Sequence, residues 1–301
     1  MIGRIGIVIV NWNAGVRLAQ CIESISSIED CTRLFEAIVV VDNASDDGSA
    51  ELAPRTAVPL TVIRNRTNRG FAAACNQGAR LLSSQYLLFL NPDTRLSKEG
   101  VPRALEAMDR ERERGIGIVG LQLLDDKGAV TRTCCRLPNA GSLLWELSGL
   151  DRLLNRWPLG YRMREFDHLS TREVGHVIGA CFLVRREVFE DLGGFDERFF
   201  LYFEDLDFSW RARRAGWRSW FVAEESAYHQ GGSCSIQIPG RRLFYSWASR
   251  ILFARKHFGR FTSAMVVLGT VIVEPLLRLV VGSLTLSFPK VRATLSAYGL
   301  T

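Results

Sequence analysis

Three apolar runs near the start of the chain constrain its fold more than any other feature. Ile5–Val10, Ala37–Val41 and Tyr86–Leu90 are continuously apolar, and helix-like stretches separate them. Continuous runs are typical of strands covered on both faces, because neither face has to meet water. Strands that alternate with helices indicate a parallel sheet with helices packed on it. The sequence therefore predicts an α/β fold.

Polar side chains follow each of these runs directly. They are Asn11 and Asn13 after the first run, Asp42 and Asn43 after the second, and Asn91 and Asp93 after the third. These residue types are also common in turns and helix caps, so a single such turn would carry little information. In open α/β sheets, ligands bind beyond the carboxyl ends of the strands. Three polar strand ends together therefore indicate a binding edge.

A second group of carboxylates, Glu204, Asp205 and Asp207, starts a helical pattern in the segment GGFDERFFLYFEDLDFSWRARRAGW. Acidic side chains are stabilised near a helix N-terminus, so capping is one explanation. Two adjacent carboxylates among Phe, Leu and Tyr side chains are also typical of a functional site. We interpret Glu204 and Asp205 as a candidate catalytic pair.

The segment from 261 to 288 is almost wholly apolar and has cations on both sides. About 25 helical residues at roughly 1.5 Å each exceed the ~30 Å hydrocarbon core of a bilayer. Glu274 and Pro275 interrupt the segment, which disfavours a simple span. We expect a membrane-embedded, re-entrant or interfacial tail. A single span and a soluble packing or dimer helix remain alternatives.

The net charge and the cysteine content limit the classes of binding partner and the cellular compartment that the sequence predicts. A net charge of +6 suits nucleic acid, an anionic membrane or a phosphorylated substrate. The arginines form no evident nucleic-acid recognition motif, so no such partner is expected. The 7 cysteines are odd in number and include no Cys-x-x-Cys, which predicts free thiols in a reducing compartment and no zinc site. The N-terminus enters a strand pattern directly, so export is not expected.

Six segments in a fixed order resemble the family 2 glycosyltransferases, and most closely their bacterial rhamnosyltransferase-like branch. They are VIVNWN, VVVDNASDDGS, NRGFAAACNQGA, LFLNPDT, the Glu204-Asp205 segment quoted above, and AYHQGG, and they cover roughly residues 4–232. The resemblance implies a GT-A fold, which is a mixed α/β sheet with flanking helices. It also implies an inverting mechanism, a nucleotide-diphosphate sugar donor, and Mg²⁺ or Mn²⁺ as cofactor.

The resemblance divides the chain into three parts. Residues 1–95 are expected to form the nucleotide-sugar-binding half of the domain. Residues 96–235 are expected to form its acceptor-binding and catalytic half, and residues 236–301 a basic and apolar helical tail that associates with the membrane.

Roles for individual residues follow from the same resemblance. Asp93 corresponds to the carboxylate that contacts the metal, and His229 to a further metal or diphosphate contact. Asn91 stands where the longer family motif has its first Asp, so that position brings no charge. Asp205 corresponds to the general base that takes the acceptor hydroxyl proton, and Glu204 is interpreted as a positioning residue.

The nucleotide and sugar pocket is expected to combine strand ends with the Asn68–Asn76 segment. Asp42 corresponds to the contact with the base and would accept N3–H of uracil or thymine. Gly70 is expected to let the backbone approach the ligand, and Arg69 to offset phosphate charge. The other lining residues implied by the resemblance are Asn11, Asn13, Asn43, Asn68, Asn76 and Asn91.

The branch-level resemblance favours dTDP-L-rhamnose as donor and a polyprenyl-diphosphate-linked saccharide as acceptor, on the cytoplasmic side of the membrane, in cell-wall or surface polysaccharide synthesis. Other dTDP- or UDP-sugars, of galactosyl, mannosyl or N-acetylglucosaminyl type, suit Asp42 equally. A nucleotidyltransferase is an alternative, but NWNAGVRLAQC is a poor phosphate loop. A non-catalytic membrane scaffold would not need Asp93 or Asp205. The sequence leaves open whether the chain forms a homodimer.

Overall fold

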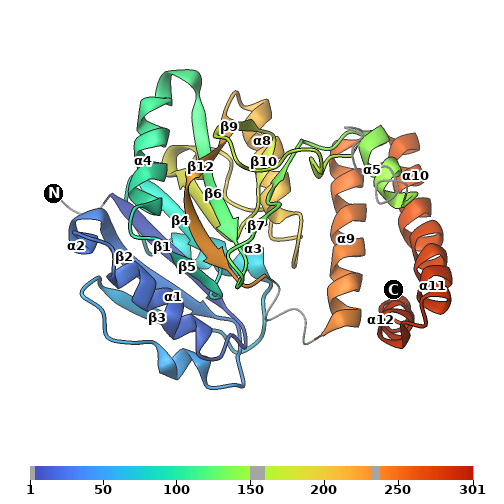
Figure 1. Cartoon of the computed structure of the whole chain (residues 1–301), viewed down its shortest axis with the longest axis horizontal. Helices are drawn as coiled ribbons and strands as arrows, with labels where there is room; N and C mark the ends of the chain where they lie inside the picture. The colour runs from blue at the N-terminus through green and yellow to red at the C-terminus, as the bar shows by residue number, and fades with distance from the viewer. Residues whose placement is uncertain (1–3, 150–159, 232–237, 301) are drawn as a thin grey trace.

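The computed structural model of the chain describes residues 4–149, 160–231 and 238–300. Its first half is a parallel sheet in the order β3-β2-β1-β4 (Figure 1). The strands are β1 (Ile5–Asn11), β2 (Phe35–Asp42), β3 (Leu60–Arg64) and β4 (Tyr86–Leu90). Every residue of β1 and β4 is buried. The continuous apolar runs therefore form the central strands, as predicted.

The two faces of β1 explain why its apolar run has no polar alternation. Ile5, Ile7 and Ile9 belong to one core with α1 (Arg17–Ser26) and α4 (Gly100–Arg110). Val8 and Val10 belong to a second core with α3 (Phe71–Ala79), α7 (Arg186–Asp191) and α8 (Glu204–Arg214). Successive side chains of a strand point to opposite faces, so both sets must be apolar here.

The second half adds strands of both directions to the same sheet. β11 (Cys181–Arg185) runs antiparallel to β4 and β6 (Ile116–Leu124), while β12 (Arg218–His229) runs parallel to β6. In the described residues the sheet has ten strands, the others being β5 (Thr94–Leu96), β7 (Val130–Thr131) and β9 (Arg172–Val174). A separate two-stranded sheet pairs β8 (Cys134–Cys135) with β10 (His176–Val177). The predicted mixed sheet with flanking helices is thus confirmed.

The helical tail packs to one side of the sheet domain (Figure 1). Its helices are α9 (Pro239–His257), α10 (Arg260–Leu268), the π-helical η4 (Gly269–Val273), α11 (Glu274–Leu284) and α12 (Phe288–Tyr298). The remaining helices of the described residues are α2 (Cys31–Leu34), η1 (Ser49–Leu52), η2 (Arg112–Arg114) and α5 (Ala140–Leu147). A third apolar core joins α5 and α8 to the tail through Phe203, Phe253 and Val266.

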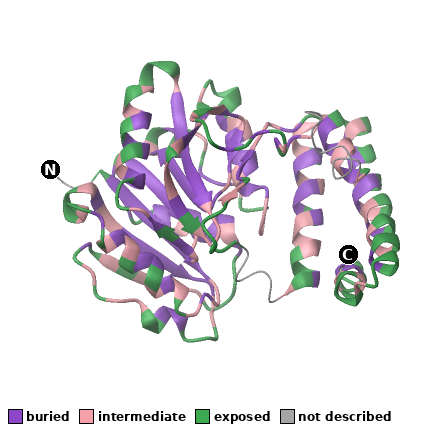
Figure 2. Cartoon of the chain, in the orientation of Figure 1, coloured by how far each residue is buried: buried purple, intermediate pink, exposed green. Residues whose placement is uncertain are grey.

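The run Arg260–Leu284 is long and apolar enough to cross a membrane, by length and composition, and 22% of its most apolar window is buried. Its outer face is exposed (Figure 2). Glu274, in the middle of this run, forms ion pairs within the tail. It pairs with Arg278 at 2.8 Å and with Arg250 of α9. The interrupting charge is therefore compensated within the helical tail.

The described cysteines are free thiols, as predicted, and Cys234 lies outside the described residues. The predicted boundary between residues 235 and 236 also lies outside them.

Candidate active site

The ends of β1 and β2 meet through their side chains. Asn11 and Asp42 are register partners, and Asn11 Nδ2 donates to Asp42 Oδ1 at 2.7 Å. The Ser45 hydroxyl donates to the same oxygen at 2.5 Å, and Asn11 Nδ2 also donates to Ser49 Oγ at 2.8 Å. Asp42 is 4% exposed, so this network fixes its carboxylate. Asn11 Oδ1 is buried and has no hydrogen-bond partner among the described residues.

Asn13 and Asn43 connect these strand ends to the following loops. Asn13 adopts a left-handed backbone with φ 51°, and its Oδ1 accepts the Asp46 N–H at 2.9 Å. Asn43 Nδ2 donates to the Gly70 carbonyl at 3.1 Å, and its Oδ1 accepts from Asn65 at 2.9 Å. Hydrogen bonds of these two side chains therefore link the ends of β1 and β2 to the neighbouring loops.

Gly70 is required by a backbone approach that the sequence did not reveal. Its φ is +85°, and a Cβ there would lie 2.6 Å from the carbonyl oxygen of Phe200. That carbonyl also accepts the Phe71 N–H at 2.8 Å. We expected Gly70 to admit a ligand, but the group next to it is the loop that leads into α8. Asn68 Oδ1 accepts the Gly70 N–H at 2.9 Å, and Arg69 is exposed.

Asn76 also holds this loop. Its Nδ2 donates to the Phe195 carbonyl at 2.8 Å and to Glu197 at 3.0 Å, and its Oδ1 accepts the Phe195 N–H at 2.9 Å. Asn76 is 7% exposed. With both ends of its amide in use, Asn76 supports the loop before α8.

The end of β4 and the end of β12 converge. His229 closes β12 and pairs with Thr94 of β5. Its Nε2 lies 3.4 Å from Asp93 Oδ1 and 3.3 Å from Asn91 Nδ2. The structure thus brings together the two residues that the resemblance assigns to the metal.

One carboxylate and one imidazole can hold a divalent cation only together with other oxygen ligands. No group of three His, Cys, Asp or Glu residues that could bind a metal occurs in the described part of the chain. Mg²⁺ commonly takes one or two protein carboxylates, waters and substrate phosphates. Asp93 and His229 therefore fit a cation that arrives with a diphosphate.

A pocket of about 230 Å³ beside Asp93 adds residues that sequence reasoning missed. It is lined by Arg17, Gln20, Asp93, Arg95, Asp126, Tyr228 and Gln230. Arg95 follows Asp93 by two residues on β5, and its guanidinium lies 5.5 Å from the Tyr228 ring centre. Its closeness to the strand-end carboxylate was the only available signal. No sequence signal marked Arg17, since a single arginine in a helical segment is typical of an ordinary surface position.

One short turn connects Asp205 to the end of β4, where Asn91 and Asp93 lie. Its Oδ2 accepts the Gly179 N–H at 2.7 Å. The carbonyl of the next residue, Ala180, accepts the Asn91 N–H at 3.0 Å and the Thr94 hydroxyl at 3.2 Å. Gly179-Ala180 therefore fixes the predicted base relative to the end of β4.

The backbone before Asp205 is strained. Tyr202 and Phe203 both have left-handed conformations, with φ 68° and 67°. Such conformations cost on the order of 1–3 kcal/mol each in residues with a Cβ and concentrate at functional sites. The surrounding contacts, including Gly70 and Asn76, hold this loop in place.

Glu204 has a different environment from its neighbour. It is 5% exposed, and its Oε2 has no hydrogen-bond partner among the described residues. Burial and then the charge of Asp205 raise the pKa of Glu204 well above its usual range. The raised pKa favours the protonated form of Glu204 relative to an ordinary carboxyl group, which fits a positioning role better than that of a base.

A larger cavity of about 900 Å³ opens beyond Asp205, toward α9, α11 and α12. His176 of β10 lines it, with Nε2 3.7 Å from Asp205 Oδ2. Burial lowers the pKa of His176, so it is neutral at pH 7. His176 was not predicted, because a lone histidine in a two-residue strand carries no sequence signal.

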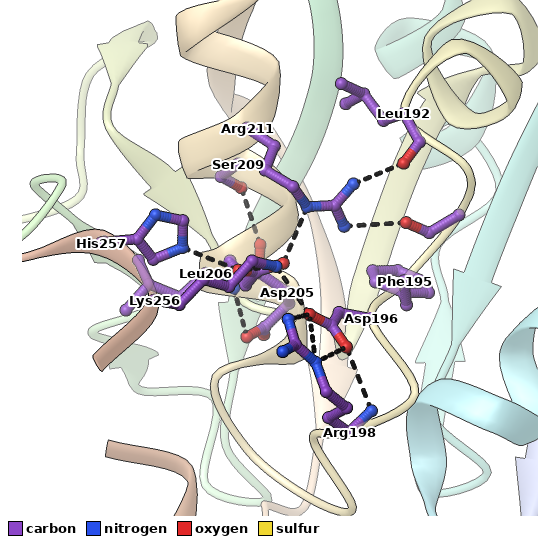
Figure 3. A network of polar contacts seen from close by, with 12 residues as sticks. Leu192, Phe195, Asp196, Arg198, Asp205, Leu206, Ser209, Arg211, Lys256 and His257 are labelled. Atoms are coloured by element: carbon purple, nitrogen blue, oxygen red, sulfur yellow. Dashed lines mark hydrogen bonds and ion pairs between the residues drawn. The ribbon is translucent and has the colours of Figure 1, made fainter. Parts of the chain in front are cut away.

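Asp207 lies at the centre of a buried ion network that joins α8 to the end of α9. Figure 3 shows its partners Arg211, Lys256 and His257. It is 0% exposed and pairs with Arg211 at 2.8 Å, with Lys256 at 2.7 Å and with His257 at 2.7 Å. Lys256 also reaches Asp196 at 2.7 Å. This network fixes α8 against the tail.

The sequence matches a known family over most of its length. Residues 6–193 match the family described as "Glycosyl transferase family 2", and residues 158–297 match "Glycosyl transferase family group 2". An N-acetylglucosaminyl-diphospho-decaprenol L-rhamnosyltransferase of Mycobacterium tuberculosis is 27% identical over 271 residues, which are 84% of this chain and 85% of that protein. A low-salt glycan biosynthesis hexosyltransferase of Haloferax volcanii is 25% identical over 71% of this chain and 63% of its own length.

Solved structures share the fold at low identity. A mannosyltransferase from Pyrobaculum calidifontis, in complex with GDP-Man and Mn²⁺, has a TM-score of 0.57 at 15% identity, covering 100% of this chain and 81% of that one. Residues 1–349 of S. aureus TarS, in complex with UDP-GlcNAc, give a TM-score of 0.57 at 15% identity, covering 98% and 79%.

Proposed function

The chain belongs to glycosyltransferase family 2, and from this premise we propose that it transfers a sugar from a dTDP- or UDP-linked donor to a polyprenyl-diphosphate-linked saccharide. The preferred donor is dTDP-L-rhamnose. Support comes from the Mycobacterium tuberculosis relative, whose name specifies L-rhamnose and a decaprenol-diphosphate-linked acceptor. The observation that carries the proposal is the placement of Asp93 and His229 beside Asp205 across the Gly179-Ala180 turn.

The nucleotide binds at the ends of β1 and β2. The Asp42 carboxylate accepts N3–H of thymine or uracil, and Asn11 and Ser45 hold it in place. Asn13, Asn43 and the Asn68–Gly70 segment enclose the base and ribose. Arg69 is exposed and free to reach the phosphates.

The donor diphosphate extends toward Asp93 and His229. Asp93 and His229 would hold a divalent cation together with diphosphate oxygens, and such a cation would offset the negative charge that develops on the leaving diphosphate. Asn91, which brings no charge, orients the imidazole of His229 through the 3.3 Å contact. Mg²⁺ and Mn²⁺ would both take the Asp93 carboxylate together with diphosphate oxygens and waters.

Transfer is a single displacement with inversion. Asp205 takes the proton from the acceptor hydroxyl as its oxygen forms a bond to the anomeric carbon. The bond from that carbon to the diphosphate oxygen breaks, and the nucleoside diphosphate leaves with the electron pair. The Gly179 and Leu206 N–H groups, at 2.7 and 2.8 Å, orient the Asp205 carboxylate.

The tail holds the enzyme at the cytoplasmic surface of the membrane. Large apolar side chains are exposed along α10, α11 and α12, among them Phe261 at 81% and Leu284 at 80%. Exposed apolar patches of this extent mark interaction surfaces. A lipid-linked acceptor is reached most directly by an enzyme whose apolar face lies in the same bilayer. Residues 1–95 and 96–235 then act as the donor and acceptor halves of one domain.

The test is transfer to a lipid-linked N-acetylglucosamine acceptor from a panel of dTDP- and UDP-sugars, with Mg²⁺, Mn²⁺ or EDTA. We expect product with dTDP-L-rhamnose, lost in EDTA and in Asp93→Asn. If only a UDP-sugar were turned over, the donor assignment to dTDP-L-rhamnose would be wrong, but the protein would still be a glycosyltransferase. Folded protein that binds no nucleotide sugar would refute the proposal.

A further inference from the structure

The 900 Å³ cavity beyond Asp205 is strongly basic. Its walls carry six cations and two carboxyl groups, Glu204 and Asp205. The cations are Arg132, Arg162, Arg164, Arg242, Arg278 and Lys290. The cations therefore outnumber the carboxyl groups among these lining side chains. A cavity of this charge is suited to an anionic ligand.

Some of these cations are compensated by the protein and others are not. Arg162 pairs with Glu146 at 2.9 Å, and Arg278 with Glu274 at 2.8 Å. Arg132, Arg242 and Lys290 form no ion pair with any residue that the structure describes. These three come from the β7–β8 connection, α9 and α12, which are far apart in the sequence. The fold therefore gathers on one cavity three cations that form no close ion pair with a described residue, of which Arg132 has a longer-range attraction to Glu165.

The cavity is also lined by apolar residues of the tail. Leu243 of α9 and Pro289 and Ala293 of α12 belong to its wall. Next to Pro289 lie Leu286 and Phe288, which are 79% and 78% exposed at the turn between α11 and α12. The basic cavity thus continues into the most exposed apolar part of the tail. A ligand with an anionic head and a long apolar chain matches both properties.

The donor diphosphate does not account for this cavity. The donor site contains Asp93 and His229, and neither residue lines the basic cavity. Asp205 is the point where the two regions meet, since it lines the cavity and contacts the Gly179-Ala180 turn. A saccharide at Asp205 would place what it is attached to among the cations.

We propose that this cavity binds the diphosphate of the lipid-linked acceptor, with Arg132, Arg242 and Lys290 as its phosphate ligands. The saccharide lies at Asp205, and the polyprenyl chain leaves past Phe288 toward the bilayer. This assignment rests on the proposed function and adds the site of the acceptor to it. Arg and Lys side chains form charge-assisted hydrogen bonds with phosphate oxygens.

Two neighbouring residues provide matched controls. Arg241 adjoins Arg242 on α9, and Arg292 lies two residues from Lys290 on α12. Both are exposed and neither lines the cavity. Arg242→Ala with Lys290→Ala therefore removes the same charge from the same helices as Arg241→Ala with Arg292→Ala. General attraction to an anionic membrane falls equally in the two double variants.

The first measurement is steady-state transfer with two acceptors that carry the same saccharide, one on a polyprenyl diphosphate and one on an alkyl glycoside. In the cavity variant, Arg242→Ala with Lys290→Ala, KM for the diphosphate acceptor should rise about tenfold or more, because charge-assisted hydrogen bonds are lost. Its KM for donor and its rate with the alkyl glycoside should match wild type. The control variant, Arg241→Ala with Arg292→Ala, should match wild type with both acceptors. Equal losses in both double variants would overturn the proposal and leave only membrane attraction.

The second measurement does not depend on catalysis. Farnesyl diphosphate, farnesol and vesicles of anionic phospholipid are titrated into the full-length protein with its donor site saturated by nucleoside diphosphate. Farnesyl diphosphate should bind wild type at least tenfold more tightly than the cavity variant, and farnesol should not distinguish them. Vesicle binding should not distinguish the two double variants. Wild type that binds farnesyl diphosphate but transfers no sugar would refute the proposed function and retain the site. Equal binding of farnesyl diphosphate by wild type and the cavity variant would refute the site alone.

Discussion

Replacing Asp207 by asparagine should separate the stability of the tail attachment from the chemistry. Asp207 is fully buried, and its carboxylate contacts the side chains of Arg211, Lys256 and His257. The change keeps the size of the side chain and removes its charge. The two basic side chains at the end of α9 then lose their shared counter-charge (Figure 3).

The size of the effect follows from that burial. Removing one partner of a buried ion network costs about 3–5 kcal/mol, because the remaining partners stay desolvated with less compensation. Lys256 keeps Asp196, and Arg211 keeps only neutral carbonyl acceptors. Unfolding entropy of roughly 2.1 cal/mol/K per residue gives about 0.6 kcal/mol/K for this chain. The expected fall in Tm at pH 7 is therefore about 5–8 °C.

The pH dependence has a definite sign. Burial alone would raise the pKa of Asp207, but hydrogen bonds from His257, Lys256 and Arg211 outweigh it and lower that pKa below the ordinary 3.8. A carboxylate with a lowered pKa stabilises the folded state above pH 3.8 and ceases to do so as pH falls through its folded pKa. The gap in stability between wild type and Asp207→Asn should therefore be full at pH 7 and narrow below pH 3.8.

The assay is thermal unfolding of the solubilised protein by circular dichroism, with Asp191→Asn as control. Asp191 is exposed and forms no ion pair with a described residue. Its variant should unfold like wild type, and donor binding should survive in both. A Tm for Asp207→Asn within about 1 °C of the control would refute the reasoning.

Three further changes test single residues of the site. Gly70→Ala should lower Tm and turnover together, by at least 1–3 kcal/mol in stability, since its φ is +85° and its Cβ would lie 2.6 Å from Phe200 O; a thermal scan showing no shift would contradict this. Glu204→Gln should keep transfer within a few-fold of wild type and gain stability over it as pH rises above 4.5, because the raised pKa of Glu204 costs wild type stability there; a tenfold loss of kcat would instead make Glu204 catalytic. His229→Ala should raise the apparent Kd for Mn²⁺ at least tenfold, read from activity against metal concentration; an unchanged Kd would remove His229 from the metal site.

The sheet was predictable because its determinants are local. Continuous apolar runs and polar strand ends are visible in the sequence, and β1, β2 and β4 bear both out. The approach of Asp93 to His229 is different in kind. It depends on the pairing of β5 with β12, which joins residues more than a hundred positions apart. Only the family resemblance could connect them.

The contacts that sequence reasoning missed share one cause. Gly70 and Asn76, which the resemblance assigns to the ligand pocket, also contact Phe200 and Phe195 of the loop before α8. Nothing in either segment signals that contact, since it is made by distant backbone groups. The basic cavity escaped the sequence for the same reason, because its cations come from segments that meet only in the folded chain.

The most direct test of the account is Asp205→Asn, measured for transfer and for donor binding in the same preparation. Asp205 is the only proposed base at the junction of donor site and cavity, so kcat should fall roughly 10²–10⁴-fold. Donor affinity should stay within about twofold of wild type, since the proposed donor residues lie at the strand ends and in the Asn68–Gly70 segment and not on α8. Loss of transfer with intact donor binding is the predicted result. Near-normal turnover by a folded Asp205→Asn enzyme would contradict the central claim.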